Sequence, residues 1–268
     1  MNQIRSLFML NRRSFVFSML AFLGTEFFGL QSCKQHKEEN SRGGGHVIMP
    51  RREVLSSLDW SSFLKKWSDD ILALLQSDIL LQASPLRKEV IKTGYLGFHA
   101  ASEQEIDATE KRLGLNLPPS YKKFLRVTNG WRQIAMDAED GSIYPVSQIG
   151  WFKDMHPQSL NNWLTGSGGL DASDQQYFIY GERQDPVHLR DSYLKGTLAI
   201  STEIDSAIYL LNPNVMDTNG EWEAWFFGYK LPGANRYQSF QEMMQAEYKN
   251  MLSNLKNEIV FRRNLNTK

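Results

Sequence analysis

The sequence predicts an α+β fold in which helices come first, strands follow and a helix closes the domain. Apolar residues recur at helical spacing over residues 54–81, and two short capped helices follow between residues 102 and 130. Short β-rich runs lie between residues 143 and 229, and a long amphipathic stretch follows them. Helices and strands segregated in this order predict a central sheet that is mainly antiparallel or mixed.

Residues 47–94 form the predicted N-terminal helical segment. Their spacing indicates one long or two short amphipathic helices, with Ser84-Pro85 ending the run and a loop at Gly94 and Gly97. Trp60 and Trp67 are seven residues apart, so we expect both to pack in the core rather than to hold a ligand. The other apolar residues of this pattern are Leu55, Leu58, Phe63, Leu64, Ile71, Leu74 and Leu75.

A capping box marks the next helix, because Ser102 is followed three residues later by Glu105. Ile106, Glu110 and Leu113 then share one face, so Glu110 lies inside an apolar stripe. A carboxylate there is either a catalytic acid with a raised pKa or an acceptor for nearby backbone amides. No second carboxylate or histidine is placed by the sequence to work with it, which favours the structural role.

A second short helix follows a proline turn. Gly114 closes the first helix, and Pro118-Pro119-Ser120 begins the second, since proline fits a first helical turn. Its apolar face starts at Tyr121, and Asn129-Gly130 ends it because both residues tolerate positive φ. This pair of helices is the most regular local pattern in the chain.

The strands and the closing helix complete the predicted domain. The closing helix covers Gln238 to Lys256, with Ser239 as its cap and Glu242 at the third position. Gly, Asn, Asp and Pro separate the strands. The predicted strands are Ile143 to Val146, Gln176 to Tyr180, Thr197 to Ser201, Ala207 to Leu211 and Glu221 to Tyr229.

The first 32 residues have the pattern of an export signal. Arg12 and Arg13 precede an apolar run from Phe15 to Leu30, and paired arginines at this place also resemble a twin-arginine motif. A spanning helix is the weaker interpretation, since Glu26 at a bilayer centre would cost roughly 2.5 to 3.5 kcal/mol. Leu30-Gln31-Ser32-Cys33 resembles the lipobox of bacterial lipoproteins, in which the cysteine is acylated after cleavage. The alternative is a lone buried cysteine.

Residues 33–46 are then a flexible tether, because they are polar and end in three glycines. Such a chain has an r.m.s. reach of roughly 20 Å. We therefore expect an exported protein anchored to the cell envelope by lipid, in the periplasm or on the outer face of a membrane.

The composition excludes several classes of function. Lysine plus arginine and aspartate plus glutamate both count 30, so no overall charge favours nucleic acid as a partner. A single cysteine excludes an intramolecular disulfide framework. The five histidines are never closer than ten residues apart, so no local metal-binding pair is present and we expect neither a metal nor a cofactor.

The order and spacing of the motifs between about Tyr95 and Tyr248 resemble those of the SMI1/KNR4 family of the SUKH superfamily. The opening motif comprises Ala101 to Ile106, Glu110, Leu113-Gly114, Leu117-Pro118, Tyr121, Phe124-Leu125 and Asn129-Gly130-Trp131. The closing half comprises Leu211-Asn212-Pro213, Gly220 to Trp225 and Ser239-Phe240. The resemblance implies a SUKH-like domain over 95–257, followed by a C-terminal tail at 258–268. It also implies structural roles for Glu110, Gly114, Pro118, Tyr121, Asn129 and Gly130.

The resemblance further implies binding rather than catalysis. The expected partner is a toxin domain, which an immunity-type protein neutralises by occluding it. Immunity members of this family are described as soluble cytoplasmic proteins, so the lipoprotein leader is a departure. The alternative is a scaffold that regulates the cell wall, as in fungal members of the family. The oligomeric state is left open.

Aromatic and acidic side chains are the predicted contacts with the partner, since aromatics supply interface area and acids pair with a basic toxin. These candidates are Trp131, Tyr144, Trp151, Glu221 and Glu223. Glu221 and Glu223 are two residues apart in a predicted strand and should point to one face. Paired carboxylates at roughly 5 to 9.5 Å also serve glycoside hydrolysis, so an envelope glycan hydrolase is the enzymatic alternative.

Overall fold

The computed structural model describes residues 47–48, 58–82, 84–134 and 140–266, all of which belong to one compact unit, Gly44–Lys268. The predicted export signal with Arg12 and Arg13, the tether and the lipid-attachment residue Cys33 lie outside the described residues.

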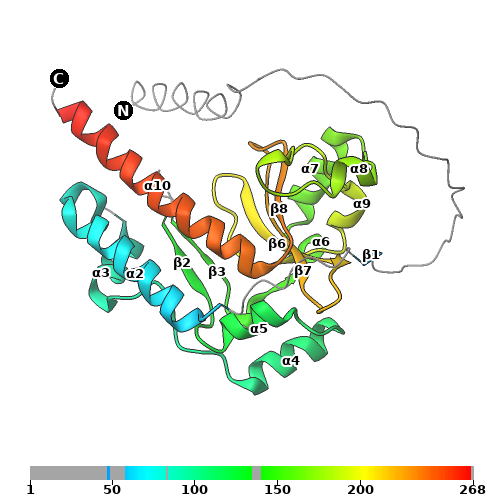
Figure 1. The fold of residues 1–268 in the computed structure, drawn as a ribbon, viewed down its shortest axis with the longest axis horizontal. Coiled ribbons are helices and arrows are strands. Elements are labelled where there is room, and N and C mark those ends of the chain that lie inside the picture. The colour runs from blue at the N-terminus through cyan, green and yellow to red at the C-terminus, as the bar shows by residue number, and fades with distance from the viewer. Residues whose placement is uncertain (1–46, 49–57, 83, 135–139, 267–268) are drawn as a thin grey trace, which may run out of the picture. The chain divides into compact units, whose positions relative to one another are not determined.

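The predicted α+β fold is confirmed (Figure 1). The main sheet has the strand order β4-β5-β6-β7-β8, and each neighbouring pair in that order is antiparallel. A short β1 (Val47–Ile48) adds a parallel pair to β6, and β2 (Trp131–Gln133) with β3 (Gly141–Ile143) forms a separate ribbon. The other strands are β4 (Gly150–Trp151), β5 (Leu198–Ala199), β6 (Ala207–Met216), β7 (Trp222–Gly228) and β8 (Gly233–Tyr237).

The N-terminal segment contains more helix than predicted. It consists of α2 (Trp60–Ser77), the 3-10 helix η1 (Ile79–Gln82) and α3 (Pro85–Thr93). The first helical run does end before Ser84-Pro85, but these two residues also begin α3, which was not predicted. The Ser84 side chain accepts the Arg87 amide, and Pro85 occupies the first turn, where no amide partner is needed.

The two predicted short helices are present, as α4 (Glu103–Leu113) and α5 (Pro119–Leu125). The prediction that Asn129-Gly130 ends the second helix is wrong, because α5 ends at Leu125, and of these two residues only Gly130 has a positive φ. Ser102 and Glu105 make both hydrogen bonds of the capping box, and Gly114 ends α4 with a left-handed φ of 73°. Asn129 accepts the Val146 amide through its side chain, so the turn after α5 is tied to the segment that follows β3.

A helical insertion between β4 and β5 contains α6 (Phe152–Met155), α7 (Pro157–Ser167), α8 (Asp174–Tyr177), the 3-10 helix η3 (Gly181–Arg183) and α9 (Asp191–Leu194). Another 3-10 helix, η2 (Val146–Gln148), directly precedes β4. The strand predicted over Gln176 to Tyr180 is wrong. Ser173 and Gln176 form a second capping box, which starts α8 instead.

Both faces of the sheet are buried, and β7 shows the alternation directly. Trp222 and Ala224 belong to the larger apolar cluster, whereas Trp225 and Phe227 belong to a second cluster under the insertion. The closing helix α10 (Phe240–Asn266) contacts β7, β8, α2 and α5, and it runs beside α2 (Figure 1). Phe240 packs against the rings of Trp60, Tyr121 and Phe124 at this junction.

The predicted C-terminal tail, 258–268, is helical as far as Asn266, because α10 continues through it. Ile259 is part of the larger apolar cluster. The buried Glu258 carboxylate receives Arg87 at 3.3 Å and Arg262 at 2.6 Å. These contacts fix the last turns of α10 on α3.

Candidate functional site

Two of the five predicted partner contacts have no exposed surface, which corrects the prediction. Trp131 lies in β2 with its ring centroid 5.2 Å from that of Trp67 and 5.6 Å from that of Tyr95. Glu223 lies in β7 and faces the cluster under the insertion. Neither side chain is available to a partner in this structure.

The Glu223 carboxylate is the centre of a buried polar cluster. It accepts the hydroxyl groups of Tyr177 at 2.5 Å and Tyr180 at 2.8 Å, the Asn212 amide at 2.9 Å and the Trp225 indole at 2.7 Å. Burial and the adjacent carboxylate both raise the pKa of the two tyrosine hydroxyls, which therefore stay protonated and donate. Four donors satisfy the carboxylate, so it has a structural function here.

Glu221 binds a different element. It precedes β7, and its carboxylate accepts the backbone amide of Ser120 at 2.7 Å and the Ser120 hydroxyl at 2.6 Å. The cap residue of α5 is Pro118, which offers no side-chain acceptor, so Glu221 supplies one from 101 residues away. Burial raises the pKa of Glu221, and the Ser120 hydrogen bonds oppose that rise.

The expectation that Glu221 and Glu223 point to one face is therefore wrong. One carboxylate caps α5 and the other is enclosed by residues of α8, β6 and β7. A pair of carboxylates that acts on a glycan needs access to the substrate and to water. In the structure, Glu223 has neither.

Tyr144 and Trp151 are half-buried and pack against the larger apolar cluster. Desolvation, with a smaller contribution from Glu203, raises the pKa of the Tyr144 hydroxyl. Each of these two side chains retains accessible surface, so they are the aromatic members of the predicted set that a partner can reach.

An exposed aromatic side chain that the sequence reasoning did not select is Phe98, of which 40% is exposed. Its ring covers the Arg132 guanidinium, with 4.1 Å between the ring centroid and Cζ. We call this pair the Phe98–Arg132 patch. The sequence contains an indication of this patch. Phe98 follows Gly97 in a predicted loop, and Arg132 directly follows the Asn129-Gly130-Trp131 motif.

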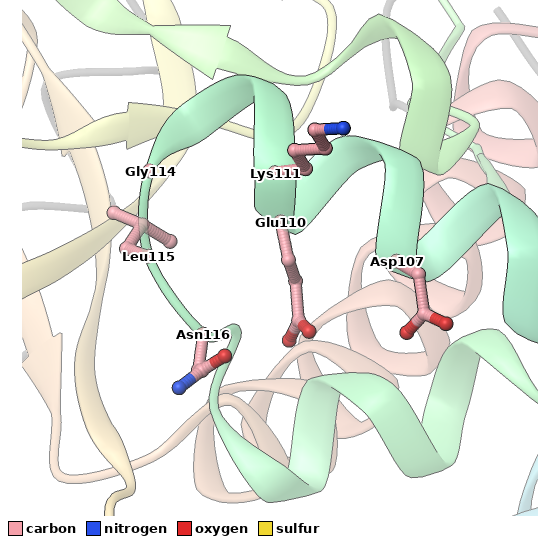
Figure 2. A pocket seen from close by; sticks show the side chains of 6 residues that line it. All are labelled: Asp107, Glu110, Lys111, Gly114, Leu115 and Asn116. Carbon is pink, nitrogen blue, oxygen red and sulfur yellow. The ribbon is translucent and has the colours of Figure 1, made fainter.

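A shallow hollow of about 410 Å³ lies at the C-terminal end of α4. Figure 2 shows Glu110 pointing from α4 toward the chain that leads into α5, while Lys111 points away. The Glu110 carboxylate accepts the Leu117 amide at 2.7 Å and lies 3.0 Å from Lys122. These contacts, both made by Oε1 of Glu110, join α4 to α5. The lining residues of the hollow are Asp107, Glu110, Lys111, Gly114, Leu115 and Asn116.

Two further kinds of site are absent from the described part of the chain. Within it, no group of three or more His, Cys, Asp or Glu side chains is arranged to hold a metal ion. None of the described helices is both long enough and apolar enough to span a bilayer.

The model of the SMI1 / KNR4 family (SUKH-1) matches residues 100–246, which run from just before α4 into α10. No curated protein matches the chain.

Proposed function

The chain belongs to the SMI1/KNR4 family (SUKH-1), and from this membership we propose that it is a non-catalytic protein-binding domain of the immunity type. Its partner is a toxin domain, which it neutralises by covering the surface that the toxin needs. The regulatory scaffold is the second role compatible with the family.

The observation that supports binding over catalysis is that Glu221 and Glu223 are hydrogen-bonded within the domain. Both carboxylates are committed to internal hydrogen bonds, one to the start of α5 and the other to four buried donors. The hydrolase alternative depends on these two side chains. The accessible aromatic residues Phe98, Tyr144 and Trp151 instead offer contact area of the kind that protein interfaces use.

We further propose that the domain is exported and held at the envelope by acylation of Cys33. This rests on the apolar run that ends at Leu30-Gln31-Ser32-Cys33 and on the polar tether that follows. Tethering concentrates a binding domain at one surface. An anchored immunity protein therefore suits a toxin that acts on the envelope or crosses it.

The test is a pull-down with the soluble form that lacks residues 1–33, followed by co-expression of the captured protein with and without the domain. Immunity predicts that a toxic protein is retained and that co-expression restores growth. A scaffold predicts retention of cell-wall enzymes without any rescue. A neighbouring toxin gene favours immunity, and a position among cell-wall synthesis genes favours the scaffold.

The result that would contradict binding is equally specific. If no protein is retained and the domain hydrolyses glycan in a manner lost in Glu223→Gln, the proposed function fails. Glu182→Gln is the matched control for that variant, since Glu182 is an exposed residue of η3.

A further inference from the structure

Arg132 differs from the other buried and half-buried arginines of the described chain. Each of the others lies within ion-pair distance of a carboxylate. Arg87 lies near Asp140 and Glu258, and Arg190 lies near Asp174. Arg236 lies near Glu223, and Arg262 lies near Glu258. Among the described residues, Arg132 has no such partner. Desolvation lowers the pKa of its guanidinium, which nevertheless stays charged at neutral pH. A half-buried charge with no carboxylate within ion-pair distance is costly and calls for an explanation.

The guanidinium of Arg132 is held in place by the segment before α4. Its Nη1 group donates to the Gly97 carbonyl at 2.7 Å and lies 3.5 Å from the carbonyls of Tyr95 and Leu96. Phe98 covers one face, and the Phe98 backbone is itself fixed by its hydrogen bond to the Thr128 hydroxyl at 2.8 Å. The guanidinium thus has a defined orientation before any partner binds.

The remaining donors of this guanidinium are not fully buried. Nε and Nη2 of Arg132 have no hydrogen-bond partner in the described chain, and neither is among its fully buried polar atoms that lack a partner. Together they are one edge of the planar fork, which matches the two oxygens of a carboxylate. The partly exposed ring of Phe98 lies against the face of the same guanidinium.

We propose that the Phe98–Arg132 patch is a contact point for a protein partner, and that it takes a carboxylate side chain of that partner in bidentate fashion. This inference rests on the proposed function and specifies the chemistry of the partner. It reverses the predicted charge pairing, in which acids of this chain meet a basic toxin. Glu221 and Glu223 are engaged in hydrogen bonds within the domain, whereas Nε and Nη2 of Arg132 have no partner in the described chain.

A carboxylate fits this point better than a phosphate group. Glu89 on α3 is the acidic residue whose field acts on Arg132, and it repels a dianion more than a monoanion. Arg and aromatic side chains next to one another are also the usual anchors of protein interfaces.

The first test uses defined probes and the full chain. The Arg132 Nε–H resonance is followed by NMR during titration with a blocked peptide, acetyl-Gly-Glu-Leu-Gly-amide. The matched probes are the same peptide with Gln for Glu, and inorganic phosphate. We expect a saturable shift with the Glu peptide, at least about fivefold weaker binding of the Gln peptide, and no response at Arg183, an exposed arginine.

Three outcomes overturn the proposal: no saturable shift with the Glu peptide, equal binding of the Gln peptide, or tighter binding of inorganic phosphate. Phe98→Ala should weaken the response to the Glu peptide. Because Phe98 is partly exposed, this variant keeps the buried core intact.

The second test separates this inference from the proposed function. In the pull-down, Arg132→Gln should reduce retention of the captured protein at least about tenfold, whereas Arg183→Gln should leave it unchanged. Equal retention by Arg132→Gln overturns the contact point while the binding function stands. If the wild-type domain retains nothing, the proposed function fails and the peptide titration still decides whether the patch binds carboxylates.

Discussion

The Glu223 carboxylate of β7 and the Arg236 guanidinium of β8 form an ion pair without exposed surface, with 3.8 Å between Oε1 and Nη1. Arg236 also donates to the carbonyls of Tyr177 and Ile179, and it lies 4.3 Å from the centroid of the Tyr177 ring. Because the Tyr177 and Tyr180 hydroxyls bind Glu223, the pair attaches the segment after α8 to the sheet at both ends.

Removing one member of this pair should destabilise the domain rather than affect a surface. Glu223→Ala leaves the Arg236 charge and four donors unsatisfied, and we expect a loss of about 3–5 kcal/mol in the free energy of unfolding. Glu223→Gln retains acceptor capacity and should cost less. Urea unfolding followed by tryptophan fluorescence measures both, with Glu182→Gln as the control. Unchanged stability of Glu223→Ala would contradict this account.

The local parts of the fold were predictable from sequence, whereas the burial of Glu223 was not. The start and end of α4 were predicted from residues within or next to that helix, namely Ser102, Glu105 and Gly114. Ser173 and Gln176 also have the spacing of a capping box, but the aromatic residues up to Tyr180 favoured the prediction of a strand.

Long-range contacts account for the remaining errors. The donors to Glu223 include Tyr177 and Tyr180, which are 46 and 43 residues away. The last turns of α10 depend on the ion pair between Glu258 and Arg87, which are 171 residues apart. Neither relationship leaves a periodic pattern in the sequence.

The outer edge of β8 is covered by the end of the insertion, and Gly233 permits this close approach. The Ala234 amide donates to the Pro186 carbonyl at 3.0 Å, and a Cβ at Gly233 would lie 1.8 Å from that carbonyl oxygen. Gly233→Ala should therefore displace the segment and cost about 1–3 kcal/mol.

The matched control for that substitution is Gly166→Ala in α7, where an added Cβ meets nothing within 4 Å. It should raise stability by about 0.5–1 kcal/mol, because alanine favours a helix more than glycine does. Thermal unfolding distinguishes the two variants by sign. A neutral Gly233→Ala would show that the segment covering β8 is free to move.

Glu247 of α10 should make stability depend on pH. Burial raises the pKa of its carboxyl above the ordinary value of 4.5, and hydrogen bonds from Tyr209 and Asn250 only partly oppose this. A raised pKa favours the folded state below the ordinary pKa, and that contribution is lost as the pH rises through the folded value. The charged carboxylate therefore destabilises the fold at neutral pH.

Glu247→Gln should raise the melting temperature at pH 7 by about 2 °C or more, and the difference from wild type should shrink toward pH 4. The amide oxygen of Gln still accepts from Tyr209, so the hydrogen bond is kept. Glu182→Gln again serves as the exposed control. A gain that is the same at both pH values would mean that charge is not the cause.

Cys33 is the predicted site of lipid attachment. The full chain should partition with membranes after export, and Cys33→Ala should release it or leave it unprocessed, because the thiol that carries the lipid is gone. Fractionation and mass spectrometry of the mature protein measure both effects. A mature protein that retains residues 1–32 and carries no lipid would contradict the prediction.

The N-terminal helix α2 should be part of the same folding unit as the family domain, although the family match begins at residue 100. Trp67 of α2 is buried, its indole donates to the Met251 sulfur of α10 at 3.3 Å, and its ring packs on Trp131. Trp67→Ala opens a cavity between these elements and should lower the free energy of unfolding by about 3–5 kcal/mol.

The control is Lys65→Ala, at a side chain that is 72% exposed on the same helix, which should change stability by less than about 0.5 kcal/mol. Urea unfolding should show one transition for both variants, shifted only in Trp67→Ala. If Trp67→Ala instead produced a separate early transition and left the main midpoint unchanged, α2 would be an independent arm and its apolar face would have to be assigned to a partner.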